Sequence, residues 1–110
     1  VTNQPQIAMN KLSLQDLENI NNHIIHYCRE KSLFIDTVSW CPHHPHKGYE
    51  SENKILKNDC FCRKPKPGML LELAYEKNID LNKSLFIGDS ITDEEAAKSA
   101  GCNFINILDL

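Results

Sequence analysis

The sequence predicts an α/β fold of three layers, in which helices cover both faces of a parallel sheet. In the second half of the chain, short apolar segments alternate with segments of helical periodicity, which is the order of a βαβ unit. The chain has 110 residues, enough to bury one hydrophobic core but not two. Its content of 41% hydrophobic and 25% charged residues is typical of a folded chain. We therefore expect a single domain over residues 1–110.

The first half of the chain predicts one helix and one strand. Ser13 and Asp16 have the spacing of a capping box, which indicates the start of a helix. Apolar residues at helical spacing then follow as far as Cys28, so we expect the helix to run from Leu14 to about Lys31. Residues 33–40 (LFIDTVSW) are β-branched and aromatic and predict a strand.

Residues 41–67 interrupt this pattern. The segment is rich in Pro, His, Lys, Asn and Cys and has no sustained periodicity. A structureless loop of this length is uncommon inside a small domain, so it needs a separate explanation. A bound metal ion would provide one, and we therefore expect residues 41–67 to form a metal-binding loop.

The second half of the chain predicts two helices and two strands. We expect a helix from Pro67 to near Asn78, a strand over 84–87, a turn over 88–92, a helix over 93–100 and a strand over 103–108. Gly101 is typical of the residue that ends a helix. In a parallel sheet, ligands bind at the carboxyl ends of the strands. Three segments leave predicted strands there, at residues 1–4, 41–67 and 88–90.

Two short Cys/His pairs predict a zinc site. Cys41 and His43 are separated by one residue, and so are Cys60 and Cys62. Three thiolates and one imidazole match the closed tetrahedral coordination of a structural zinc ion. His44 and His46 compete with His43 as the nitrogen ligand, and we choose His43 because its spacing mirrors that of the second pair. The odd count of five cysteines also argues against a framework built only of disulfides.

Residues near the predicted strand ends suit a phosphate and a magnesium ion. Asp89 directly follows the strand over 84–87 and could bind Mg²⁺ through oxygen, whereas we interpret Asp93 as a helix cap. Arg63 and Lys64 follow the second Cys pair, so a folded metal loop would fix two cations that could neutralise a phosphate. Thr2 and Asn3 add a hydroxyl and an amide at another strand end.

Charge and hydropathy make some partners improbable. The chain has 12 Lys and Arg against 15 Asp and Glu, a net charge of −3, and no basic block that could follow a nucleic-acid backbone. It also lacks an apolar run of about 18 residues, the length of a membrane span. Its first ten residues do not have the pattern of a signal peptide. We therefore expect neither nucleic acid nor a membrane as partner, and a cytoplasmic location.

Four segments together resemble the haloacid dehalogenase (HAD) superfamily. They are VTNQ (1–4), CPHHP (41–45), CFCRKPKPGML (60–70) and GDSITD (88–93). Within the superfamily they are most similar to the D-glycero-D-manno-heptose 1,7-bisphosphate phosphatases, whose relatives include the histidinol phosphatases. The Cys pair joined to CRKP is specific to this branch, whereas the GD turn is shared across the superfamily. The PGML continuation favours the heptose branch.

The resemblance implies a Rossmann-like sheet and a role for each candidate residue. Thr2 and Lys64 would be catalytic and contact the transferring phosphoryl group, and Asn3 and Arg63 would bind the substrate. Asp89 would bind a catalytic Mg²⁺. The structural Zn²⁺ would be bound by Cys41, His43, Cys60 and Cys62. In this family an aspartate attacks phosphorus and a second aspartate, two residues later, acts as acid and base. Both belong to a D-x-D motif on the first strand, and the substrate is a small phosphorylated sugar.

The D-x-D motif is missing from this sequence. Aspartates stand at positions 16, 36, 59, 80, 89, 93 and 109, and no two of them are separated by one residue. We interpret the fold as incomplete at its amino end, with the nucleophile strand absent. The chain alone is therefore expected to be inactive, and its open sheet edges predict self-association.

Three alternatives to the heptose-bisphosphate activity stay open on the sequence. The first is a histidinol-phosphate phosphatase, the nearest enzyme by resemblance. The second is a non-catalytic binding module that keeps the zinc loop without the chemistry. The third is a zinc ribbon that binds nucleic acid or protein, which would explain the Cys/His pairs but neither GDSITD nor CRKP.

Overall fold

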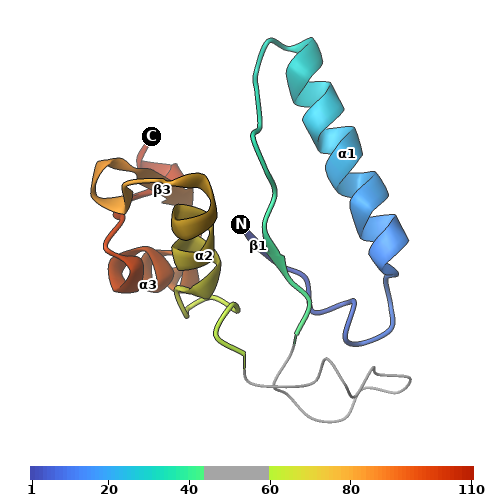
Figure 1. Cartoon of the computed structure of the whole chain (residues 1–110), viewed down its shortest axis with the longest axis horizontal. Helices are drawn as coiled ribbons and strands as arrows, with labels where there is room; N and C mark the ends of the chain where they lie inside the picture. Colours follow the sequence, from blue (N-terminus) through green and yellow to red (C-terminus); the bar gives the residue numbers. More distant parts are fainter. Residues whose placement is uncertain (44–59) are drawn as a thin grey trace. The chain divides into compact units, whose positions relative to one another are not determined.

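The computed structural model describes residues 1–43 and 60–110 and divides the chain into two compact units (Figure 1). The amino-terminal unit comprises Thr2–Asn58, and the carboxyl-terminal unit comprises Asp59–Leu110 together with Val1. Most of the predicted metal loop, including His44 and His46, lies outside the described residues. The single domain over 1–110 stays a prediction.

The amino-terminal unit is built on a pair of parallel strands. Strand β1 (Thr2–Asn3) pairs with β2 (Trp40–Cys41), with Thr2 opposite Trp40 and Asn3 opposite Cys41. Helix α1 (Leu14–Glu30) lies between them in the chain (Figure 1). This is a βαβ unit, the connection that parallel strands require.

Helix α1 begins where the sequence predicts. Ser13 is the N-cap: its hydroxyl accepts from the N–H of Asp16 at 3.0 Å, and the Asp16 carboxylate accepts from the N–H of Ser13 at 3.4 Å. The capping box is therefore confirmed. Leu17 is buried, whereas Leu14, Ile20 and Ile24 stay exposed.

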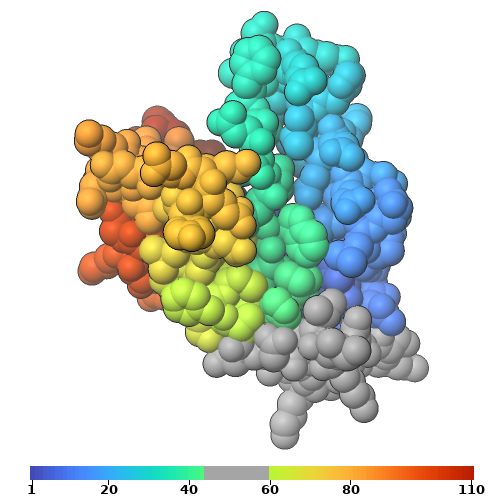
Figure 2. Space-filling model, viewed as in Figure 1, coloured from blue at the N-terminus to red at the C-terminus, as the bar shows by residue number. Residues whose placement is uncertain are grey.

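The strand predicted over 33–40 is wrong for most of its length. Only Trp40 and Cys41 pair with β1, and Leu33–Ser39 has no regular structure. Phe34 is 79% exposed, and Figure 2 shows this segment at the surface of its unit. The reason is that a strand needs a partner, and the described part of β1 offers only two residues to pair with.

The carboxyl-terminal unit contains a second parallel pair with helices packed against it. Its elements are α2 (Gly68–Lys77), β3 (Leu85–Gly88), α3 (Ile91–Ala100) and β4 (Asn103–Asn106), with short 3-10 turns at Leu81–Lys83 and Ile107–Asp109. Strands β3 and β4 pair in parallel from Leu85 opposite Asn103 to Gly88 opposite Asn106. Helix α3 connects them and contacts both, and α2 contacts α3. The predicted βαβ order is confirmed.

Each element of this unit differs from the prediction in at least one boundary, and β3 runs over Leu85–Gly88 rather than 84–87. Helix α3 begins at Ile91 rather than Asp93, because Ser90 is its N-cap. Strand β4 ends at Asn106 rather than Leu108, because the Asn106 side chain accepts from the N–H of Leu108 at 2.9 Å and starts a 3-10 turn. Pro67 is the N-cap of α2 rather than part of its first turn.

Small side chains allow the elements of this unit to pack closely. Ala96 and Ala97 on α3 are fully buried, and Met69 on α2 is 2% exposed. Gly101 ends α3 at φ 76°, a left-handed conformation that glycine adopts without the strain of a Cβ atom. None of the helices in the described part of the chain combines the length and apolar character needed to cross a membrane.

Candidate functional site

The turn after β3 is organised by the carboxylate of Asp93. Ser90 and Asp93 form a capping box: the Ser90 hydroxyl accepts from the N–H of Asp93 at 3.2 Å, and Asp93 Oδ2 accepts from the N–H of Ser90 at 3.3 Å. The same Oδ2 accepts from the N–H of Asp89 at 3.2 Å. Asp93 therefore takes part in capping α3, but as the third residue of the helix, because the N-cap is Ser90 and not Asp93 as predicted.

Gly88 is required by the position of Asp93. A Cβ atom at residue 88 would lie 2.5 Å from the Cβ of Asp93 and 2.6 Å from its Oδ2, far inside van der Waals contact. The absence of a side chain at Gly88 therefore lets the capping carboxylate reach the end of β3.

Lys64 forms an ion pair with Asp93. Lys64 Nζ donates to Asp93 Oδ1, and the two side chains are 15% and 6% exposed. Burial alone would raise the pKa of Asp93, but hydrogen bonds from Lys64 and Ser90 and the charge of Lys64 outweigh it and lower the pKa from 3.8 to about 2. Sequence reasoning missed this pairing, because 29 residues separate the partners and no periodicity links them.

The Lys64 side chain also lies near aromatic residues of the sheet. Its Nζ is 5.9 Å from the ring centroid of Phe86 on β3. Phe86 in turn contacts Phe104 on β4 edge to face, with 6.0 Å between ring centroids. The predicted cation is therefore held at the strand pair instead of extending into solvent.

Asp89, the predicted magnesium ligand, has a different environment from Asp93. Its side chain is exposed and makes no hydrogen bond to the described residues, while its backbone N–H is fixed by Asp93. An exposed carboxylate on a fixed backbone is suited to a hard cation such as Mg²⁺, which binds through oxygen and keeps several waters.

The segment that carries Arg63 and Lys64 is a tight turn between the second Cys pair and α2. The carbonyl of Phe61 accepts from the N–H of Gly68 at 3.0 Å, and the Arg63 carbonyl accepts from the N–H of Lys66 at 2.9 Å. A Cβ atom at Gly68 would lie 2.3 Å from the Phe61 oxygen. The Cys pair is thus fastened to the start of α2, and Lys64 leaves from the same turn.

In each of the two predicted ligand pairs, the two donor atoms lie close together. Cys41 Sγ lies 3.5 Å from His43 Nδ1, and Cys60 Sγ lies 3.3 Å from Cys62 Sγ. None of the five cysteines forms a disulfide. The donors of each pair are near enough to bind one ion, and their combined chemistry, three sulfurs and one imidazole, fits zinc better than a hard cation.

Thr2 and Asn3 stand on β1 in the amino-terminal unit. Both are half-buried, and Thr2 Oγ1 accepts from the side-chain amide of Gln4 at 3.3 Å. The structure therefore brings Thr2 together with Gln4, and Lys64 together with Asp93. The sequence analysis did not identify Gln4 as the partner of Thr2 or Asp93 as the partner of Lys64.

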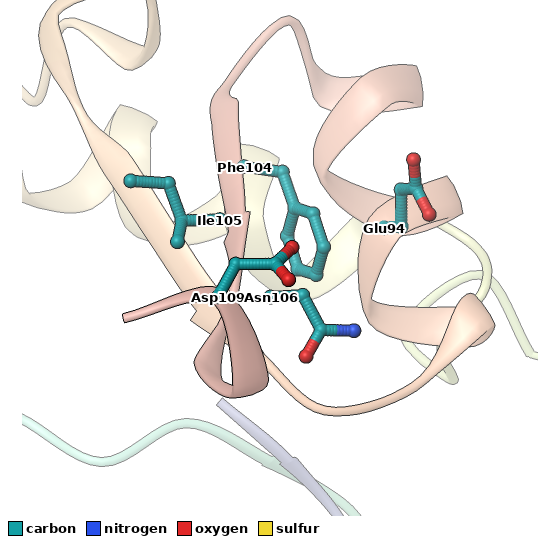
Figure 3. Close-up of a pocket in the computed structure, with 5 residues that line it drawn as sticks. All are labelled: Glu94, Phe104, Ile105, Asn106 and Asp109. Atoms are coloured by element: carbon teal, nitrogen blue, oxygen red, sulfur yellow. The ribbon is translucent and has the colours of Figure 1, made fainter.

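A pocket of about 470 Å³ opens beside β4 (Figure 3). It is lined by Glu94, Phe104, Ile105, Asn106 and Asp109, which come from α3, β4 and the 3-10 turn after it. None of the predicted site residues lines this pocket.

Comparison with known proteins relates these residues to phosphatases. Residues 61–109 match the HAD-hydrolase-like family. A HAD-like phosphatase structure from Mesorhizobium loti superposes with a TM-score of 0.82 at 33% identity and covers 93% of this chain and 47% of its own. This chain is similar to HAD-like phosphatases in sequence and in fold. The fold predicted from the sequence is confirmed.

Two curated relatives share one activity in their names. D-glycero-beta-D-manno-heptose-1,7-bisphosphate 7-phosphatase from Rhodopseudomonas palustris is 37% identical over 92% of this chain and 54% of its own length. The Escherichia coli K12 protein of that name is 34% identical over 91% of this chain and 50% of its own. The D,D-heptose 1,7-bisphosphate phosphatase of B. bronchiseptica, solved with magnesium and phosphate, superposes with a TM-score of 0.77 at 30% identity and covers 93% of this chain and 51% of its own. The chain thus spans about half the length of the relatives it matches.

Proposed function

We propose that this chain carries part of the active site of a phosphatase that removes the 7-phosphate of D-glycero-D-manno-heptose 1,7-bisphosphate. The observation that carries the proposal is the buried Lys64–Asp93 pair beside exposed Asp89 at the end of β3, in a homologue of enzymes named for this reaction. Because those relatives are named for the heptose substrate, we do not propose a histidinol phosphatase, a non-catalytic module or a zinc ribbon.

Each candidate residue has a proposed task toward the phosphoryl group. Lys64 donates hydrogen bonds to its oxygens, and its charge stabilises the transition state. Thr2 donates its hydroxyl to the same group, while Asn3 and Arg63 bind the rest of the substrate, Arg63 through its planar fork. Asp89 would hold Mg²⁺, which supplies positive charge against the phosphate when bound.

Zinc has a structural role in this proposal. Cys41, His43, Cys60 and Cys62 would bind one ion, and no position would then remain for a reacting water. The close donors within each pair support the proposal. Binding would hold the turn from which Arg63 and Lys64 leave, because the Cys60–Cys62 pair is fastened to α2.

Three further expectations accompany the proposal. The chain acts as a single phosphatase-like domain with its zinc loop at 41–67, and it is cytoplasmic with a role in carbohydrate metabolism. Its partners are the sugar phosphate and, through open sheet edges, other copies of the chain, but neither nucleic acid nor a membrane.

The experiment follows from the missing D-x-D motif. The 110-residue chain is mixed with the heptose bisphosphate and Mg²⁺, and phosphate release is measured. We expect no turnover from the chain alone. Activity should appear when its amino end is joined to a strand that carries the D-x-D motif and to the helix that follows this strand in the family.

Variants of this chimera test the role of Lys64. Lys64→Ala should lower kcat by about 100-fold, the usual cost of losing an electrostatic contact to the transition state. Lys83→Ala is the matched control, because Lys83 is an exposed lysine of the same unit. Turnover by the unaided chain, or equal activity of the two variants, would contradict the proposal.

A further inference from the structure

We propose that one exposed side of α1 is an interface through which two copies of the chain pair, with their α1 helices side by side and antiparallel. This side consists of Asp16, Ile20, Ile24, Tyr27 and Lys31, and we call it the α1 face. It shares no residue with the open sheet edges or with the candidate phosphatase site, so the inference does not depend on the proposed function.

The centre of the α1 face is apolar and exposed. Its residues follow one another at intervals of three or four, so they lie along one side of the helix. Ile20, Ile24 and Tyr27 are 47%, 46% and 56% exposed, whereas the fold buries a neighbouring side of α1, where Leu17 is 1% exposed. A row of large apolar side chains left in solvent is typical of an interaction surface.

Opposite charges stand at the two ends of this row. Asp16, in the first turn of α1, precedes Ile20 by four residues. Lys31, the C-cap, follows Tyr27 by four residues, and its Nζ lies 5.7 Å from the centroid of the Tyr27 ring. Asp16 and Lys31 are both exposed. The α1 face is therefore acidic at one end, apolar in the middle and basic at the other end.

These positions are arranged symmetrically along the helix. The midpoint between Asp16 and Lys31 is also the midpoint between Ile20 and Tyr27, and it lies next to Ile24. If a second copy packs antiparallel about a two-fold axis at this midpoint, Asp16 of each copy faces Lys31 of the other, and Ile20 faces Tyr27. A parallel pair would place Asp16 against Asp16 and Lys31 against Lys31. The face is thus complementary to itself in the antiparallel arrangement and not in the parallel one.

The size of the α1 face indicates a weak association. Since a helix rises about 1.5 Å per residue, the face is about 22 Å long and only one row of side chains wide. This is smaller than the interfaces of stable dimers, so we expect dissociation in the micromolar to millimolar range of chain concentration.

Charge reversals test the pairing of Asp16 with Lys31. Sedimentation equilibrium of the 110-residue chain measures the dissociation constant of the dimer, with Zn²⁺ and a reductant present so that no disulfide links two copies. Asp16→Lys and Lys31→Glu each set like charges against one another at both ends of the interface, so each should raise the dissociation constant at least about fivefold. The double variant restores opposite charges and should return to within about twofold of the wild type.

Glu18→Lys and Arg29→Glu are the matched controls. Glu18 and Arg29 are exposed residues of α1, but their spacing places them on another side of the helix. Because charges away from the contact are screened, these reversals should leave the dissociation constant within about twofold of the wild type. Asp16→Lys also removes the capping carboxylate of α1, but the double variant lacks it as well. Restored dimerisation in the double variant therefore separates the effect of charge from the loss of the cap.

A lysine at the centre of the α1 face tests its apolar part. Ile24→Lys sets two ammonium groups beside the two-fold axis and should leave the chain monomeric, whereas Phe34→Lys changes a 79% exposed residue outside α1 and should not. Circular dichroism verifies the helix content of each variant. A wild type that stays monomeric up to millimolar concentration would overturn the proposal. So would a dimer that Ile24→Lys leaves intact, or charge reversals that the double variant does not rescue, because such a dimer would form through another surface.

Discussion

The stability of the folded chain depends on the ionisation of Asp93. Its pKa is lowered from 3.8 to about 2: burial opposes the shift, and hydrogen bonds from Lys64 and Ser90 exceed that opposition. Between these two values the unfolded chain takes up a proton that the folded chain does not. Stability from this group is therefore present above about pH 4 and is lost as the pH falls toward 2.

This shift predicts a pH-dependent difference between the wild type and Asp93→Asn. A change of this size corresponds to about 2 kcal/mol, so the wild type should lose about that much of its advantage between pH 4.5 and pH 2. Urea unfolding at both pH values measures it. Other acid effects, including protonation of the Cys/His pairs, act on both proteins and cancel in the difference. An advantage that is the same at both pH values would contradict the prediction.

Asp93 has two roles, of which one could be predicted from the sequence and the other could not. Its capping role was predictable, because Ser90 and Asp93 are three residues apart and cap through local backbone contacts. Its pairing with Lys64 was not, because that contact forms only once the turn at 61–68 and the end of β3 have been brought together by folding.

Among the secondary-structure elements too, those set by local signals were predictable and those that depend on distant partners were less so. Helices α1, α2 and α3 were predicted within two or three residues of their bounds, since periodicity and caps are local signals. Strands were less predictable: residues 33–39 have β-branched and aromatic side chains but no pairing partner in the described structure, whereas β3 and β4 pair over four residues each. Strand propensity indicates a segment that fits a sheet, and the neighbouring strand decides whether it pairs.

The local control of α1 can be tested at its N-cap. Ser13→Ala removes the hydroxyl that accepts from the N–H of Asp16, so it should lower the free energy of unfolding by about 1 kcal/mol. Asn22→Ala is the control at an exposed position inside the same helix, where alanine has the better helix propensity and no loss is expected. Urea unfolding distinguishes the two variants, and equal stabilities would show that the cap does not stabilise α1.

For the whole molecule, a zinc ion bound at the proposed site would be a large single source of stability. The chain has 110 residues, and its fully buried side chains are few, with Leu17, Met69 and Cys41 the largest among the described residues. A domain of this size has a total stability of about 5–15 kcal/mol. Structural zinc can contribute on the order of 10 kcal/mol of apparent folding energy, so its loss would be comparable with the whole.

Metal removal is therefore expected to unfold much of the chain. Metal analysis of the purified protein should find about one zinc per chain, and a chelator should lower the thermal midpoint and the helical circular dichroism together. Cys62→Ser should reproduce this effect because it removes a proposed ligand. Cys28→Ser changes a half-buried thiol on α1 that is outside the proposed ligand set, and it should keep its zinc. A chain that stays folded with an unchanged midpoint after its metal is gone would show that the loop at 41–67 is held by other contacts, and the structural role of zinc would have to be abandoned.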